Sequence, residues 1–598
     1  MRLPLNPART NVLFPFSRLL LTPPAVNVRL HRLNSTAPIR HELRPDDHYD
    51  EQPRSRPRVS KWFLAVLVLV SYAGYFSGQG ALGLVGPDEP RYVSIARAME
   101  RTGDWVTPRL NGAPWFEKPA LYYWAAAASF KLFGENDFTA RFPSALAAML
   151  AAAAIAWMAW RFYGGTTSLL ALLMFPTSVA TFVFARAATP DMLFTGTLAA
   201  AMAYGAALIF EESPGFWSRA GFGFFLGAAT LAKGPAAVLL AGGSVLVWAA
   251  FSRKWTRSFR LAHPLSILFF LLTSVPWYFL CARRNPDFLN VFIFQHNFER
   301  FLTPVFHHVK PWWFFPPILV LWILPWSALL FALGLRAAAI KEWRDRFARP
   351  GFYFACWTIF IVIFFSASKS KLPGYILPAV PPLVLLLAAA ASRIRCIRDD
   401  AARGVTMGLG ATWLALVVGA GFWLHRQLPT SPFAQPQSIW YFLAVAAAGG
   451  AIIAALGSAR RIAAALLTNA ALIACLLMAA NWFIVPRIDP SVSSRATARA
   501  FLAAESAGGV TNAEKIPAGS LGSYQLDRPW QYGLEYYLGH PIPEWTPESG
   551  GSFWLFTNDP GCRDIRRRGM ECIPVQQTAP AAWLVRIQPA PPRRTASP

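Results

Sequence analysis

Residues 142–162 read FPSALAAMLAAAAIAWMAWRF, a long apolar run with a single charge, Arg161. A helix that crosses the hydrocarbon core of a bilayer needs roughly 20 apolar residues, so this segment is predicted to be a transmembrane helix. Similar runs recur along the chain, and hydropathy predicts about 13 spans in all. They lie at residues 61–80, 142–162, 167–185, 190–210, 216–232, 235–251, 261–281, 313–334, 351–368, 373–391, 405–425, 437–457 and 462–482.

The composition agrees with a membrane protein. Of the 598 residues, 55% are hydrophobic and only 15% are charged, yet the net charge is +25. Soluble domains carry about 25% charged residues, so a disordered protein, a disulfide scaffold and a secreted soluble enzyme are excluded. A nucleic-acid binder would explain the charge but not the hydrophobicity. A polytopic protein in a lipid bilayer explains both, if the positive charge lies mostly on one side.

The charged loops predict that orientation. The N-terminal tail through Lys61 has a net charge of +6 and residues 252–260 have +4, whereas residues 86–141 carry seven basic and seven acidic side chains. Loops rich in Lys and Arg stay in the cytoplasm. We therefore expect the N-terminus to be cytoplasmic, and residues 86–141 and the C-terminus to lie on the outer side.

Three parts follow from this reading. Residues 1–58 are rich in Pro and Arg and predict a disordered cytoplasmic tail, although a transit peptide would have a similar composition. Residues 59–486 form an all-α polytopic domain, whose first outer loop, 86–141, carries juxtamembrane helices. Residues 487–598 contain Gly-Gly turns and strand-like pieces such as SFWLFT and AAWLVRI, which predict a small α/β or α+β outer domain.

Two of the six cysteines, Cys562 and Cys572, fall in this outer domain. An oxidising compartment would allow a disulfide between them, but sequence alone does not show whether their geometry fits. The pairing stays open at this point. No cysteine or histidine spacing in the chain resembles a zinc site.

Polar residues gather in the outer loops. The first loop contains GPDEPRY at 86–92 and WFEKPALYYW at 115–124. Charged groups at membrane depth are costly and usually functional. A pump would place them near the midplane, so a cluster at the outer headgroups suits chemistry on a lipid headgroup. Further polar groups on the same face are Arg186, Asp191, Lys233, His296 and the segment SKSKLPGY at 368–375.

PDEPRY followed by WFEKP and then by a KLPGY turn resembles the polyprenyl-phosphate-dependent membrane glycosyltransferases, over about residues 60–400. Within them, lipid A aminoarabinose transferases are nearer and protein O-mannosyltransferases more distant. The resemblance implies a GT-C fold in the bacterial inner membrane, with the outer side in the periplasm. It also implies a polyprenyl-phosphate-linked sugar as donor and a glycolipid, such as lipid A, or a protein as acceptor.

The resemblance implies that Asp88 is catalytic, with Glu89 sharing its role. A carboxylate can accept the proton of an attacking hydroxyl or orient the acceptor. The alternative is that either acid simply caps the helix that begins here, a position that Asp serves well.

Phosphate binding is implied for Arg91 and Lys118, because guanidinium and ammonium groups bind phosphate oxygens. Arg91 is three residues after Asp88, so a simple salt bridge between them is the alternative. Lys369, Lys371 and Tyr375 are predicted to complete the phosphate site, against the alternative of lysines that snorkel from a helix end.

Glu117 is a candidate ligand for a divalent metal ion, or else forms an interfacial ion pair with Lys118. Asp191 and His296 are predicted as further site residues, although a lone histidine in an aromatic loop is more often structural. Arg186 and Lys233 could merely flank helix ends. The chain has no Gly-rich phosphate loop or dinucleotide fingerprint, which agrees with a donor carried on a lipid phosphate.

The sequence thus predicts an inverting membrane glycosyltransferase. One alternative is a protein O-mannosyltransferase-like activity, which differs in its acceptor. Another is a lipid or sugar transporter, which predicts internal repeats and broken helices at the midplane. The sequence shows neither feature.

Overall fold

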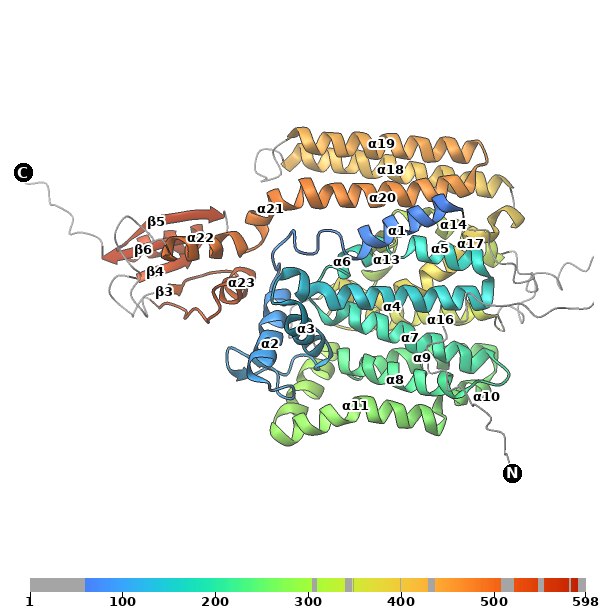
Figure 1. Cartoon of the computed structure of the whole chain (residues 1–598), viewed down its shortest axis with the longest axis horizontal. Helices are drawn as coiled ribbons and strands as arrows, with labels where there is room; N and C mark the ends of the chain where they lie inside the picture. The colour runs from blue at the N-terminus through green and yellow to red at the C-terminus, as the bar shows by residue number, and fades with distance from the viewer. Residues whose placement is uncertain are drawn as a thin grey trace, which may run out of the picture. The chain divides into compact units, whose positions relative to one another are not determined.

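The computed structural model describes residues 60–303, 309–338, 347, 349–397, 399–427, 436–506, 521–546, 553–579 and 582–589. These residues form a bundle of membrane helices and a C-terminal segment with a small sheet (Figure 1). The predicted disordered tail, 1–58, lies outside the described residues.

Within the described part, eight helices are long and apolar enough to cross a membrane, or up to nine if one bent pair counts as a span. Each of the eight coincides with a predicted span, so the multi-span membrane fold is confirmed. Helices α1 (Lys61–Tyr75), α8 (Phe216–Lys233) and α9 (Ala236–Ser252) occupy three more predicted spans. The eight are α4 (Asp137–Tyr163), α7 (Pro190–Phe210), α11 (Pro264–Arg284), α16 (Pro350–Ala367), η5 with α17 (Pro373–Ala379 and Val380–Ile397), α18 (Asp399–Gln427), α19 (Pro436–Ser458) and α20 (Ile462–Phe483).

Two of the predicted spans are broken in the structure. Span 167–185 divides into α5 (Gly165–Met174) and α6 (Val179–Phe184). Span 313–334 becomes α13 (Phe315–Trp322), then η4 (Trp326–Ala328) and α14 (Leu329–Ala338), with a bend of 113°. A proline lies at each break, and proline lacks the N–H that continues a helix. Neither break contains an ionisable side chain, unlike the charged broken helices of many transporters.

Helix α7 is central to the bundle and fixes one part of the candidate site. It packs along α4, where a Cβ on Gly196 would lie only 2.3 Å from the carbonyl oxygen of Ala147. Small residues allow such close approach between membrane helices. Most of the α7 span is buried inside the protein, so Asp191 in its first turn is held on a rigid element.

The loop that we expect on the outer side, residues 86–141, contains two helices before α4. Helix α2 (Asp88–Thr102) begins at the Asp-Glu pair and ends at Gly103, whose φ of 70° suits glycine at a helix C-terminus. A two-stranded hairpin, β1 (Arg109–Leu110) and β2 (Ala113–Pro114), leads to α3 (Leu121–Phe133). Other short helices of the chain are α10 (Trp255–Ser258), η2 (Phe259–Ala262), η3 (Asn290–Glu299) and α12 (Arg300–Leu302).

The C-terminal segment mixes helices with a four-stranded sheet, as predicted. The strand order is β3-β4-β6-β5, in which β3 is parallel to β4 and the other pairs are antiparallel. The boundary at 487 remains a prediction. The strands are β3 (Leu521–Ser523), β4 (Phe553–Thr557), β5 (Met570–Ala579) and β6 (Ala582–Pro589), and the helices are α21 (Val485–Val492), α22 (Arg495–Ser506), α23 (Arg528–Leu538) and α24 (Asp559–Arg567).

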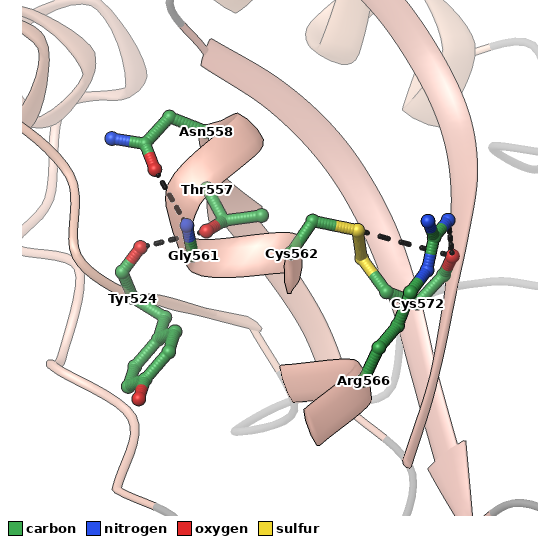
Figure 2. The surroundings of a disulfide bond; sticks show 7 residues. All are labelled: Tyr524, Thr557, Asn558, Gly561, Cys562, Arg566 and Cys572. Carbon is green, nitrogen blue, oxygen red and sulfur yellow. Dashed lines mark hydrogen bonds between the residues drawn. A yellow bond between two sulfur atoms is a disulfide. The ribbon is translucent and has the colours of Figure 1, made fainter. Parts of the chain in front are cut away.

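A disulfide joins Cys562 to Cys572, which the sequence had left open. Figure 2 shows it linking α24 to β5. The start of α24 is fixed by Asn558, whose side-chain oxygen accepts a hydrogen bond of 2.9 Å from the Gly561 N–H. Arg566 donates to the Cys572 carbonyl oxygen at 3.1 Å. The covalent link thus reinforces a contact that hydrogen bonds also make.

Candidate active site

Arg91 is the centre of a charged cluster at the start of α2. Its Nη2 lies 2.5 Å from Asp88 Oδ1 and 3.0 Å from Glu117 Oε2. The Lys118 ammonium lies 3.4 Å from Glu117 Oε1. The structure therefore brings together four predicted site residues from two separate motifs. Both ion pairs that we considered as alternatives are present within the cluster.

Asp88 is the first residue of α2, and the position before it is Pro87. The N-cap residue is therefore Pro87 and not Asp88, so the capping alternative is not supported. Its side chain is 51% exposed, whereas that of Arg91 is 13% exposed. The carboxylate is thus reachable from outside while its partner is held inside the cluster.

The surroundings shift the acidity of Asp88. Burial raises the pKa of its carboxyl above the ordinary value. The Arg91 guanidinium lowers this pKa, and the carboxylates of Glu117 and Asp191 raise it further, with a smaller lowering effect from Lys118. A raised pKa brings a carboxylate closer to the range in which a general base works best.

Three aromatic rings lie near the Arg91 guanidinium. Its central carbon lies 5.2 Å from the ring centre of Tyr92, 5.6 Å from Trp115 and 5.9 Å from Tyr532. These distances are typical of cation–π contacts. Tyr532 comes from α23, more than 400 residues along the chain, and the sequence alone gave no sign of it.

Some buried donors in this cluster have no hydrogen-bond acceptor among the residues the structure describes. They are Arg91 Nε, Trp115 Nε1 and the Tyr123 hydroxyl. The Tyr123 side chain is 1% exposed, and burial raises the pKa of its hydroxyl well above the usual value. It therefore remains a neutral donor. Buried donors normally have partners, so these groups are available to the oxygens of an anionic ligand.

Glu89, predicted to share the role of Asp88, lies in a different environment. Its side chain is 5% exposed and faces Arg141, whose Nε and Nη2 lie 3.0 and 2.7 Å from its two oxygens. It also accepts hydrogen bonds from the N–H groups of Val85 (2.8 Å) and Ala188 (2.7 Å). These four hydrogen bonds occupy the acceptor sites of a carboxylate. The structure therefore favours a structural role for Glu89 and not the catalytic one.

The sequence analysis missed Arg141. This residue also donates to the carbonyl oxygens of Gln79, Leu82 and Gly83, at 2.6 to 2.8 Å. It thereby ties the chain before α2 to the start of α4. The available signal was a charge directly before the apolar run 142–162.

Asp191 and Lys233 form a second ion pair close to the first cluster. Asp191 lies near enough to Asp88 to act on its pKa. The Lys233 ammonium is 5.5 Å from the ring centre of Tyr375, which belongs to the predicted KLPGY turn. Asp191 and Tyr375 therefore lie together as predicted, and Lys233 joins them instead of merely ending α8.

The structure shows other surroundings for the remaining predicted residues. Among the described residues, Lys369 and Lys371 form no ion pair with Asp88. His296 lies in η3. Lys369 is exposed, and the buried Lys371 donates to the Ser368 carbonyl oxygen. Arg186 donates to carbonyl oxygens at the end of α1, which fits the helix-end alternative.

The structure gives little support to a metal at Glu117. In the described ranges, no group of three or more His, Cys, Asp or Glu side chains could hold an ion. Glu117 faces two cations, Arg91 and Lys118, and such neighbours oppose the binding of another cation. We therefore route no chemical step through a metal.

Comparison with known proteins agrees with the predicted resemblance. The family described as dolichyl-phosphate-mannose-protein mannosyltransferase matches residues 117–279. Proteins named undecaprenyl phosphate-alpha-4-amino-4-deoxy-L-arabinose arabinosyl transferase are also similar. The one from Edwardsiella ictaluri is 33% identical over 374 residues, and the one from Yersinia enterocolitica is 34% identical over 353 residues. These matches cover 60% and 57% of this chain, and 66% and 62% of the relatives, slightly under two thirds of their length.

The fold has a solved counterpart. The crystal structure of ArnT from Cupriavidus metallidurans bound to undecaprenyl phosphate superposes with a TM-score of 0.69 and covers 88% of this chain and 98% of that one. The sequences are 22% identical, so this likeness establishes the fold. Sequence and fold together confirm the resemblance to polyprenyl-phosphate-dependent membrane glycosyltransferases of the GT-C type.

Proposed function

We propose that this chain is a membrane glycosyltransferase that moves a sugar from a polyprenyl phosphate to a periplasmic acceptor, such as lipid A. The observation that carries the proposal is the joined cluster of Asp88, Arg91, Glu117 and Lys118. It combines an accessible carboxylate with two phosphate-binding cations. The names of the sequence relatives favour an aminopentose on undecaprenyl phosphate as the donor.

The cluster suggests how the transfer proceeds. An acceptor oxygen attacks the anomeric carbon of the sugar while the bond from that carbon to the phosphate oxygen breaks. Asp88 takes the acceptor proton, or orients an acceptor that is already anionic. Arg91 and Lys118 stabilise the negative charge that builds on the departing phosphate. Attack opposite the leaving group inverts the anomeric configuration.

Arg91 has a donor left for this task. Its Nη2 is occupied by the two carboxylates, but its Nε–H has no acceptor among the described residues. The donor is buried, so a phosphate oxygen that accepts from it would form a charge-assisted bond out of water, where such bonds are strong. Asp191, Lys233 and Tyr375 border the same region and would contact the donor sugar or phosphate.

The direct test uses purified protein in liposomes with undecaprenyl-phosphate-linked aminoarabinose. One arm contains lipid A and the other a Ser/Thr peptide, and mass spectrometry reads the products. We expect lipid A to gain the mass of one sugar. A glycosylated peptide would instead support the O-mannosyltransferase-like alternative. Movement of the donor across the bilayer without any glycoside would support the transporter.

The disulfide supports the proposed orientation, in which the site and the C-terminus face the periplasm and the N-terminus faces the cytoplasm. Disulfides persist in the periplasm and are rare in the cytosol. We expect Cys562 and Cys572 to resist alkylation in acid-quenched cells unless a reductant is added first, as mass spectrometry of the alkylated peptides would show. Cys475, a free cysteine within α20, is the internal reference once the cells have been denatured. Full labelling of both cysteines without reductant would place the segment in the cytoplasm.

The pH profile tests Asp88 as the ionised group. Because the Glu117 carboxylate raises the pKa of Asp88, Glu117→Gln removes a negative charge and lowers that pKa. The acid limb of kcat/KM reports the essential base of the free enzyme. We therefore expect this limb to move to lower pH in Glu117→Gln, and to stay in place in Glu544→Gln, a change on the exposed surface of the C-terminal segment. A shift to higher pH would contradict the assignment.

A further inference from the structure

Helix α23 of the C-terminal segment packs directly against α2. The Arg97 guanidinium lies over the ring of Tyr536 at 3.8 Å, and its Nη1 donates to the Tyr536 carbonyl oxygen at 2.7 Å. Asn111, in the hairpin after α2, donates to Glu535 Oε2 at 3.1 Å. The contact therefore involves both the helix and the loop that leads to Glu117.

A second set of bonds fixes the other side of α23. The Tyr537 hydroxyl accepts from the Leu84 N–H and donates to Asp137 Oδ1, each at 2.7 Å. Asp137 also accepts from Arg495 Nη1 at 2.8 Å. This network joins the chain before α2, the start of α4 and the C-terminal segment. Helix α23 is thus held by polar contacts on both sides.

Helix α23 approaches Ser494 closely at Gly533. A Cβ at this position would lie 2.2 Å from Ser494 Oγ and 3.9 Å from a ring carbon of Pro90. Pro90 directly precedes Arg91 in the chain. The glycine therefore allows the close contact between α23 and Ser494, while Pro90 of α2 lies at ordinary van der Waals distance. The preceding residue, Tyr532, lies near Arg91.

We propose that Tyr532 is a positioning residue of the transferase site, whose ring completes an aromatic enclosure that holds Arg91 against Asp88 and Glu117. Two of the three rings, those of Tyr92 and Trp115, come from the first outer loop, and the third comes from the C-terminal segment. That segment is then part of the site and not an appended domain. The inference rests on the proposed function.

The geometry explains why a third ring matters. Arg91 forms ion pairs with two carboxylates. To bind phosphate, its guanidinium must keep its position between them and not move toward either one. Cation–π contacts with three rings stabilise the guanidinium in its present place and leave its N–H edge able to donate. The ring of Tyr532 performs this task, so phenylalanine should replace tyrosine at this position without loss.

The test compares Tyr532→Phe with Tyr532→Leu in full-length protein, with Arg528→Ala as the matched control. Arg528 is exposed on the same helix. We expect Tyr532→Leu to lower kcat/KM roughly tenfold, the size of effect that loss of a partly buried cation–π contact allows. Tyr532→Phe and Arg528→Ala should remain within about twofold of the wild type.

The pH profile separates positioning from a merely structural effect. The charged groups that face Asp88 are Arg91 on its own helix, Glu117 and Lys118 before α3, and Asp191 on α7. If Arg91 loosens in Tyr532→Leu, it lowers the pKa of Asp88 less, so the acid limb should move to higher pH. Tyr532→Phe should restore the wild-type limb.

Three results would overturn the inference. Tyr532→Leu could match the wild type, its acid limb could stay in place, or Tyr532→Phe could lose as much activity, which would implicate the hydroxyl. If Tyr532→Leu does not fold, Tyr532→Met replaces it, because the longer and more flexible methionine side chain fills the site without a ring. If the wild-type protein transfers no sugar, that result refutes the proposed function but leaves the role of Tyr532 undecided. Binding of undecaprenyl phosphate to the same variants would then test Tyr532, and equal affinities would overturn its role.

Discussion

Asp88→Asn is expected to lower sugar transfer on the order of 100- to 10,000-fold, the range by which a positioned general base speeds a reaction. The amide keeps the shape of the carboxylate but cannot accept the proton of the attacking hydroxyl. It also lacks the negative charge that pairs with the Arg91 guanidinium, so the orientation of Arg91 and of an anionic acceptor should change. Because the side chain is 51% exposed, the substitution should leave folding nearly unchanged. The measurement is turnover of the lipid-linked donor in membranes, with the melting midpoint in detergent measured alongside.

Glu100→Gln is the matched control for this prediction. It removes a carboxylate from the same helix, α2, three turns beyond Asp88, where the structure shows no contact with Arg91 or Asp88. We expect its turnover to stay close to the wild type. Wild-type turnover in Asp88→Asn would remove Asp88 from the mechanism, even if the chain proves to be a glycosyltransferase.

The sequence predicted the fold well wherever hydropathy was decisive. The apolar run 142–162 became α4, and the run 190–210 became α7. The prediction failed inside 167–185 and 313–334, because hydropathy measures apolarity and does not register where a helix breaks. Pro176 and Pro325 mark those breaks, but a proline can also kink a helix without ending it.

The site was predictable only where its residues are close in sequence or share a motif. Asp88, Arg91 and the pair at 117–118 were found that way, and they do meet. The contribution of Tyr532 comes from tertiary packing of a segment more than 400 residues away, which no local pattern encodes. For Glu89 the motif implied a catalytic role, whereas the structure favours a structural one. A motif does not show which of two adjacent acids points into the protein.

Glu89→Gln is expected to destabilise the protein by about 3–5 kcal/mol, the cost of breaking a buried ion pair by removing one partner. The carboxylate accepts four bonds, two of them from Arg141. An amide would point an N–H at one of these donors. It would also leave the charge of Arg141, whose side chain is 2% exposed, without a compensating carboxylate. The expected readout is a clearly lower melting midpoint in detergent, with any loss of turnover following the loss of folded protein.

The double variant Glu89→Met with Arg141→Met separates the charge from the other contacts. Removing both charges avoids the unpaired cation, so the double variant should be more stable than Glu89→Gln. It should not regain the full stability of the wild type, because the carbonyl oxygens of Gln79, Leu82 and Gly83 lose their donor. A Glu89→Gln protein that melts like the wild type but transfers no sugar would reverse our assignment and make Glu89 catalytic. Asp88 and Glu89 would then both act on the substrate. The buried position of the Glu89 carboxylate against Arg141 argues against this outcome.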